Sequence, residues 1–175
     1  MAFERAVDQG SAYQMGAAAL FISAASILTA LGFQYIGGYQ PCKLCLMERY
    51  AYYAAIPVLF LAITLFSGGH KRSAAALFFL VALAYLANAG LGTYHAGAEW
   101  KFWPGPTTCG GDAQPVTSAG SLLKDLEGVR VVRCDEAAIR VLGLSFAGWN
   151  VVGSLLLMAV SLNAAFAASV SRTRV

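Results

Sequence analysis

The spacing of charged residues constrains this chain more than any other feature of its sequence. Four stretches of at least 20 residues hold no Asp, Glu, Lys or Arg, and they lie between Asp8 and Lys43, Arg49 and Lys71, Arg72 and Glu99, and Arg140 and Arg172. A helix of about 20 residues crosses a hydrocarbon core about 30 Å thick. We therefore predict four membrane spans, near residues 14–36, 47–66, 73–94 and 146–168.

The composition excludes the main alternatives to a membrane protein. Of the 175 residues, 58% are hydrophobic and only 12% are charged, whereas a soluble domain carries about 25% charged residues. A chain this short then has too little polar surface to cover a water-soluble core. A disordered chain and a nucleic-acid-binding protein are equally disfavoured, since the net charge is only +3.

The apolar stretches favour helices over barrel strands. Lipid cannot hydrogen-bond to exposed backbone, so spans are either helices or strands of a closed barrel. The run 74–81 is continuously apolar, whereas barrel strands alternate polar and apolar residues. We predict an all-α, integral membrane four-helix bundle that forms one domain over residues 1–175. The first span is too long for the apolar part of a cleaved signal peptide, so we expect it to be retained.

Four spans place both termini on one side and two loops, about 37–46 and 95–145, on the other. Five Lys and Arg residues lie on the terminal side and seven on the loop side. The five occur in much shorter segments, and short flanks dominate the positive-inside rule. The charges therefore favour, weakly, termini in the cytoplasm.

All four cysteines, Cys42, Cys45, Cys109 and Cys134, lie in the two loops that share a side. An even number of cysteines confined to one aqueous face indicates disulfide chemistry in an oxidising compartment. This placement supports loops outside the cytoplasm. A disulfide between Cys109 and Cys134 would close a long loop and stabilise the fold by roughly 3.5 kcal/mol through chain entropy. A Cys-x-x-Cys disulfide closes only a very short loop, so it adds little stability and suits reversible chemistry.

The Cys42-Lys43-Leu44-Cys45 motif lies where the second span begins. A helix starting near Lys43 or Leu44 places Cys45 in its first turn, where unpaired N–H groups favour a thiolate. Arg49 lies one turn further on the same face, and its positive charge also favours the thiolate form of Cys45. The alternative for Arg49 is an interfacial anchor, with Glu48 as a neighbour in that role.

We expect no metal site, because the other two cysteines are far apart and the two histidines lie on opposite sides. His95 lies where the third span meets the long loop, and it can donate, accept or titrate near neutral pH. The alternative for His95 is a solvated interfacial residue.

Three segments together resemble one known family. They run from Gly32 to Tyr50 around Pro41-Cys42-Lys43-Leu44-Cys45, from Trp103 to Cys109 after the histidine, and from Cys134 to Asn150 at the entry to the last span. They resemble the bacterial disulfide-bond formation protein DsbB family, and the resemblance covers all four cysteines and all four spans.

The resemblance implies a function in the bacterial inner membrane, with both termini cytoplasmic. The family reoxidises DsbA, a periplasmic thiol oxidase, and passes the electrons to a membrane quinone, either ubiquinone or menaquinone.

Carried over by position, Cys109 receives the partner's attack and Cys134 is its mate. Cys134 then exchanges with Cys42, which leaves Cys45 as the thiolate facing the quinone. Arg49 stabilises that thiolate and the quinone anion, and His95 helps to bind or protonate the quinone.

Two alternatives remain. A membrane scaffold could carry purely structural disulfides. A carrier that moves reducing equivalents outward is less favoured, because it needs thiols within the spans or on the terminal side, and the sequence has none there.

Overall fold

The computed structural model describes residues 2–106 and 133–173, with side chains at 11–106 and 133–170. Its long helices are α1 (Ala2–Tyr35), α2 (Lys43–Ser67), α3 (Lys71–Glu99) and α5 (Phe146–Thr173). Each contains a segment long and apolar enough to cross a membrane, and these segments are Ser11–Tyr35, Lys43–Ser67, Lys71–Glu99 and Phe146–Val170. The predicted all-α four-helix membrane fold is confirmed, and the chain is a multi-pass membrane protein.

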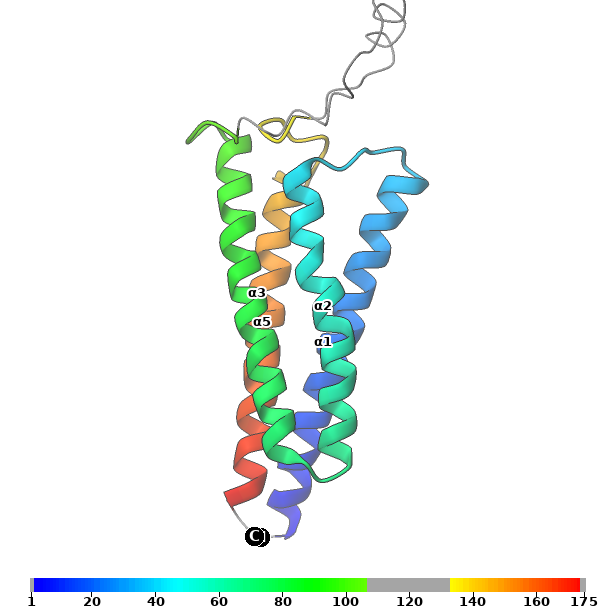
Figure 1. The fold of residues 1–175 in the computed structure, drawn as a ribbon, viewed down its shortest axis with the longest axis vertical. Helices are drawn as coiled ribbons and strands as arrows, with labels where there is room; N and C mark the ends of the chain where they lie inside the picture. Colours follow the sequence, from blue (N-terminus) through cyan, green and yellow to red (C-terminus); the bar gives the residue numbers. More distant parts are fainter. Residues whose placement is uncertain (1, 107–132, 174–175) are drawn as a thin grey trace, which may run out of the picture.

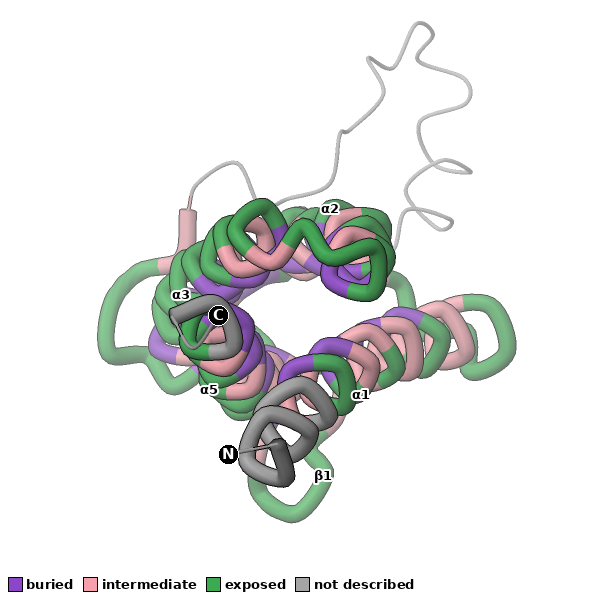
Figure 2. The backbone as a smooth tube through the Cα atoms, turned by 90° about the horizontal axis from the view of Figure 1, so that it is seen from below, coloured by how far each residue is buried: buried purple, intermediate pink, exposed green. Residues whose placement is uncertain are grey.

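The helices run alternately up and down and surround the bundle axis in chain order (Figures 1 and 2). Each packs on its neighbours in that order, α3 on α5 most extensively, and α5 closes the ring against α1. Figure 1 places the start of α1 and the end of α5 at one end of the bundle. The start of α2 and the end of α3, which carry the predicted site residues, lie at the opposite end.

One face of each helix is turned inward. In α3 the buried positions recur every three or four residues and include Ala74, Phe78, Val81, Tyr85, Asn88, Gly92, His95 and Glu99. In α2 they include Leu44, Glu48, Tyr52, Ala55 and Leu59. This is the helical repeat, and it places Glu48, His95 and Glu99 on the inward faces. Large apolar side chains such as Phe60, Phe79 and Phe166 point outward, as expected of a surface that faces lipid.

The half of the bundle away from the cysteines has a tightly packed apolar core. Leu59 and Phe78 are fully buried there among alanines. A Cβ added at Gly16 would lie 2.7 Å from the Phe78 ring, so only glycine allows α1 to approach this side chain so closely. Small residues serve this purpose in membrane helices because van der Waals packing holds such helices together.

Helix α3 continues to Glu99, about a turn beyond the predicted end near residue 94. A charged residue usually marks the end of a membrane span, yet Glu99 is buried beside His95. The chain then folds back. The Trp103 indole covers Gly97 and leaves no room for a Cβ there, and its Nε1–H donates to the Tyr94 carbonyl at 2.9 Å. His95 therefore lies inside a helix rather than at a solvated loop.

A short hairpin leads into α5. Strands β1 (Arg140–Val141) and β2 (Leu144–Ser145) pair antiparallel. The two turn residues, Leu142 and Gly143, have positive φ angles of 52° and 84°, as two-residue hairpin turns require. The hairpin ends at Ser145, which is buried at the cysteine end of the bundle.

Candidate redox site

The Cys-x-x-Cys pair forms the start of α2. Cys42 is the N-cap residue, and its Sγ accepts a hydrogen bond from the Cys45 backbone N–H at 3.2 Å. Both cysteines are free thiols, with 3.1 Å between their sulfurs. Cys45 lies in the first helical turn, as the sequence indicates. The helix N-terminus, however, acts most directly on the sulfur of Cys42, because a capping side chain comes from the residue before the first turn.

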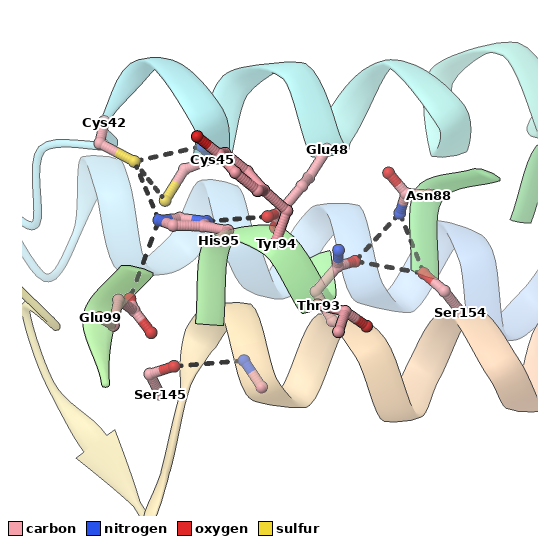
Figure 3. A network of polar contacts seen from close by, with 12 residues as sticks. Cys42, Cys45, Glu48, Asn88, Thr93, Tyr94, His95, Glu99, Ser145 and Ser154 are labelled. Carbon is pink, nitrogen blue, oxygen red and sulfur yellow. Dashed lines mark hydrogen bonds and ion pairs between the residues drawn. The ribbon is translucent and has the colours of Figure 1, made fainter. Parts of the chain in front are cut away.

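His95 reaches this pair from α3 (Figure 3). Its Nε2 lies 3.5 Å from Cys42 Sγ, and its Nδ1 lies 2.8 Å from Glu48 Oε1. All three side chains are buried to more than nine-tenths. A carboxylate can only accept, so Glu48 fixes the tautomer with the proton on Nδ1 when the ring is neutral. Nε2 is then free to take a proton from Cys42.

Hydrogen-bond donors converge on Cys42. The Cys45 thiol, donating to the sulfur of Cys42, is the largest cause that lowers the pKa of Cys42 to about 4. Burial opposes this shift, whereas His95 and the Cys45 backbone N–H add to it. The dithiol therefore favours one thiolate, on Cys42, at neutral pH.

A cavity of about 440 Å³ lies beside Cys45, between α1, α2 and α5. Its walls are largely apolar and include Phe21, Ile22, Ile27, Phe33 and Phe146. One part is polar, with Gln34, Cys45, Glu48 and Arg49 in its lining. The Arg49 guanidinium donates to Gln34 Oε1 across the α1–α2 interface. A mostly apolar cavity of this size with a few polar groups is typical of small-molecule sites.

A second polar network lies deeper in the bundle. Asn150 Oδ1 accepts from the Tyr52 hydroxyl at 2.8 Å and from Asn88 Nδ2 at 3.2 Å, and Asn88 Nδ2 also donates to Ser154 at 2.9 Å. These bonds join α2, α3 and α5. Sequence analysis missed this network, although polar residues inside apolar spans signal inward-facing positions.

Cys134 is 1% exposed and packs in one cluster with Cys42 and Leu44. Its sulfur is in a disulfide. The Lys101 ammonium holds the next residue, donating to the Asp135 carboxylate at 2.7 Å and to its carbonyl at 2.8 Å. Cys109 lies outside the described residues, so the predicted Cys109/Cys134 pair stays a prediction.

The structure brings Cys42, Cys45, Arg49, His95 and Cys134 to one end of the bundle. His95, however, is not among the described residues that line the cavity, and its ring contacts Cys42 and Glu48 instead. Sequence analysis treated Glu48 as an interfacial neighbour of Arg49 and did not single out Glu99 or Gln34. The sequence did offer a signal for the two glutamates. Glu48 lies three residues after Cys45 and Glu99 four residues after His95, and side chains at these spacings are neighbours on one helix face.

Comparison with known proteins identifies relatives across most of the chain. The family model "Disulfide bond formation protein DsbB" matches residues 13–164. Disulfide bond formation protein B 1 of Pseudomonas fluorescens Pf-5 is 33% identical over 133 residues, which is 73% of each chain. Disulfide bond formation protein B of Burkholderia pseudomallei K96243 is 32% identical over 140 residues, covering 76% of this chain and 79% of the relative. No solved structure gives a significant match.

Proposed function

Because the chain belongs to the DsbB family of disulfide bond formation proteins, we propose that it is a membrane thiol oxidase. It reoxidises a DsbA-like periplasmic dithiol protein and passes the electrons to a membrane quinone. It lies in the bacterial inner membrane with both termini in the cytoplasm and with the cysteines on the periplasmic side.

One observation carries this proposal: the two cysteines of the pair face different surroundings. Cys42 is buried in one cluster with Cys134 and Leu44, whereas the partly exposed Cys45 packs against the outside of that cluster and also lines the apolar cavity. A relay needs one sulfur within reach of the incoming thiol and another beside the electron acceptor. A pair of structural thiols would have no reason for this division.

Electrons move by thiol–disulfide exchange, in which a thiolate attacks a disulfide sulfur and the other sulfur leaves. The partner's dithiol reduces the Cys109/Cys134 disulfide and becomes a disulfide itself. The Cys134 thiolate then attacks Cys42 of the Cys42–Cys45 disulfide, and Cys45 leaves. The Cys109 thiolate next attacks Cys134, and Cys42 leaves. The Cys109/Cys134 disulfide is thereby restored, and two electrons and two protons reside on the Cys42/Cys45 pair.

His95 and Glu48 handle the proton of Cys42. A nucleophile, a base and a group that orients the base form the arrangement by which enzymes activate thiols. Nε2 takes the proton from Cys42, and Glu48 holds the ring by Nδ1–H. When the Cys42 thiolate closes the disulfide with Cys45, the two electrons of the pair would leave through Cys45 to a quinone in the adjoining cavity.

Arg49 and Gln34 form the polar part of the cavity wall next to Cys45. A bound quinone supplies an acceptor for two electrons and two protons. The Arg49 guanidinium places a permanent positive charge where negative charge develops, and a largely apolar cavity strengthens that interaction. The apolar walls exclude water and admit a lipid-soluble molecule.

The test follows quinone absorbance in purified protein, without oxygen, after addition of a reduced DsbA-like protein. We expect one quinone reduced per partner dithiol oxidised, and loss of this reaction in Cys45→Ser. A Cys45→Ser protein that reduces quinone at the normal rate contradicts the assignment. A scaffold with purely structural disulfides predicts no quinone reduction in either protein.

A further inference from the structure

Three side chains of the kinds that bind metal ions converge at the start of α2. The sulfurs of Cys42 and Cys45 and a ring nitrogen of His95 all lie within 4.8 Å of one another. We propose that the reduced protein binds one thiophilic divalent cation, of the Zn²⁺ or Cd²⁺ class, through these residues and the Glu99 carboxylate. The sequence predicts no metal site, because the other two cysteines are far apart and the two histidines lie on opposite sides.

The distances suit a tetrahedral ion. Bonds of about 2.3 Å to sulfur and about 2.0 Å to nitrogen place two sulfurs about 3.8 Å apart and a sulfur and a nitrogen about 3.5 Å apart. Cys42 Sγ lies 3.5 Å from His95 Nε2 and 3.1 Å from Cys45 Sγ. Of these two pairs, only the sulfurs need to separate, by about 0.7 Å, which side-chain rotation of the partly exposed Cys45 provides. The Glu99 carboxylate must also turn toward the sulfurs, because it is not among the groups that already lie within 4.8 Å of one another.

Glu48 prepares His95 for this role. Its Oε1 accepts from Nδ1–H at 2.8 Å, which leaves the lone pair of Nε2 directed at the sulfurs. Histidines that bind metals usually donate their other N–H to a carboxylate in this way, and the carboxylate strengthens the nitrogen as a ligand.

Glu99 completes the set from the same helix face as His95 (Figure 3). It is 8% exposed, its Oε1 lies 3.8 Å from Nε2, and its Oε2 has no hydrogen-bond partner among the described residues. An unpaired buried carboxylate oxygen is costly, and a cation held between Glu99, His95 and the sulfurs removes that cost.

Binding depends on the redox state. Each thiol releases one proton and forms one metal–sulfur bond, and no electron moves. The Cys42–Cys45 disulfide offers no thiolate, so the oxidised protein lacks two of the four ligands. If the proposed function holds, the cation also blocks turnover, since it occupies both sulfurs, and a chelator restores the activity.

The test titrates CdCl₂ into the full-length protein in detergent, in a reduced sample free of thiol reagents and in a sample oxidised with diamide, which forms disulfides without any quinone. We expect one Cd²⁺ per reduced chain, seen as an ultraviolet thiolate-to-cadmium band, and no band in the oxidised sample. Equal Cd²⁺ affinity in both samples overturns the proposal.

Variants assign the ligands. Cys45→Ser is expected to lose the band, and Glu48→Gln to weaken binding about 10–100-fold. Unchanged affinity in Glu99→Gln overturns the fourth ligand. The matched control is the double variant Cys109→Ala, Cys134→Ala, which removes the other two thiols and retains the band. A band lost in this control places the site elsewhere and overturns the proposal.

Quinone reduction measured without metal separates this inference from the proposed function. Cadmium bound only by the reduced protein, with no quinone reduced, leaves the metal site standing and removes the proposed function. Normal quinone reduction with no cadmium bound leaves the proposed function standing and removes the metal site. Unfolding temperatures in detergent show whether each variant folds. If Cys45→Ser does not fold, Cys45→Ala takes its place.

Discussion

The two ends of the bundle solve different physical problems. Away from the cysteines, Leu59 and Phe78 pack among alanines in an apolar core. At the cysteine end, Glu48, His95 and Glu99 are buried instead. Buried ionisable groups in a membrane protein are costly and mark functional sites. The apolar half therefore fixes the positions of the helices, whereas the cysteine half holds polar groups that the fold alone does not need.

The largest expected effect tests the polar end. His95→Gln removes the base beside Cys42, and we expect quinone reduction to slow by about 10²–10⁴-fold with little change in unfolding temperature. Stopped-flow absorbance of the quinone measures the rate. The matched control is His70→Gln, at the opposite end, where the histidine is exposed and its side chain makes no capping bond to α3. Equal slowing in both variants contradicts the proposed role of His95.

The next effect tests the apolar end. Phe78→Ala leaves a void among fully buried residues, and we expect a loss of about 3 kcal/mol in the free energy of unfolding. Turnover per folded molecule remains close to normal, because the site lies elsewhere. Reversible unfolding in mixed micelles measures the loss. Phe79→Ala is the control, since Phe79 is 49% exposed; a similar loss there would show that burial is not the cause.

A third prediction concerns the charge on Cys42. Its lowered pKa, about 4, means that the thiolate persists above that pH and is lost as the pH falls through it. At pH 7 an ordinary thiol is only about 3% ionised, so the thiolate population differs about 30-fold. Ultraviolet thiolate absorbance of the reduced protein, titrated with acid, gives the midpoint. Because His95 is one cause of the shift, His95→Gln raises the midpoint, and an unmoved midpoint contradicts that cause.

The smallest effect concerns the cavity wall. Arg49→Lys keeps the charge but loses the planar fork that donates to Gln34. We expect the KM for quinone to rise about tenfold, equivalent to about 1.4 kcal/mol, with folding preserved. Steady-state kinetics over a range of quinone concentrations measure it. Arg72→Lys at the far end is the control, and an unchanged KM for Arg49→Lys returns Arg49 to an anchor at the membrane interface.

The sequence was sufficient for the fold because charge spacing alone reports where lipid lies. Gaps between charges predicted four spanning helices, and Pro41 followed by Cys42 and Cys45 predicted the redox pair at the start of α2. The sequence also identified Arg49 as a polar neighbour of Cys45, because residues four apart in a helix lie on the same face.

What the sequence could not supply is contact between helices. That His95 faces Cys42 rather than the cavity depends on how α3 is rotated against α2, and on a further turn of α3 that ends at Glu99. The charge of Glu99 suggested a boundary, whereas its burial beside His95 makes it part of the site. The bonds that join Tyr52, Asn88 and Asn150 depend on the same packing.

Cys42 caps α2 with the atom whose oxidation state changes in the proposed reaction. A disulfide sulfur carries no charge and accepts a hydrogen bond poorly, so each turnover weakens and then restores the first turn of this helix. The amide proton of Cys45 thereby becomes a built-in indicator of redox state. Its NMR chemical shift and its exchange with solvent follow the chemistry without any added label.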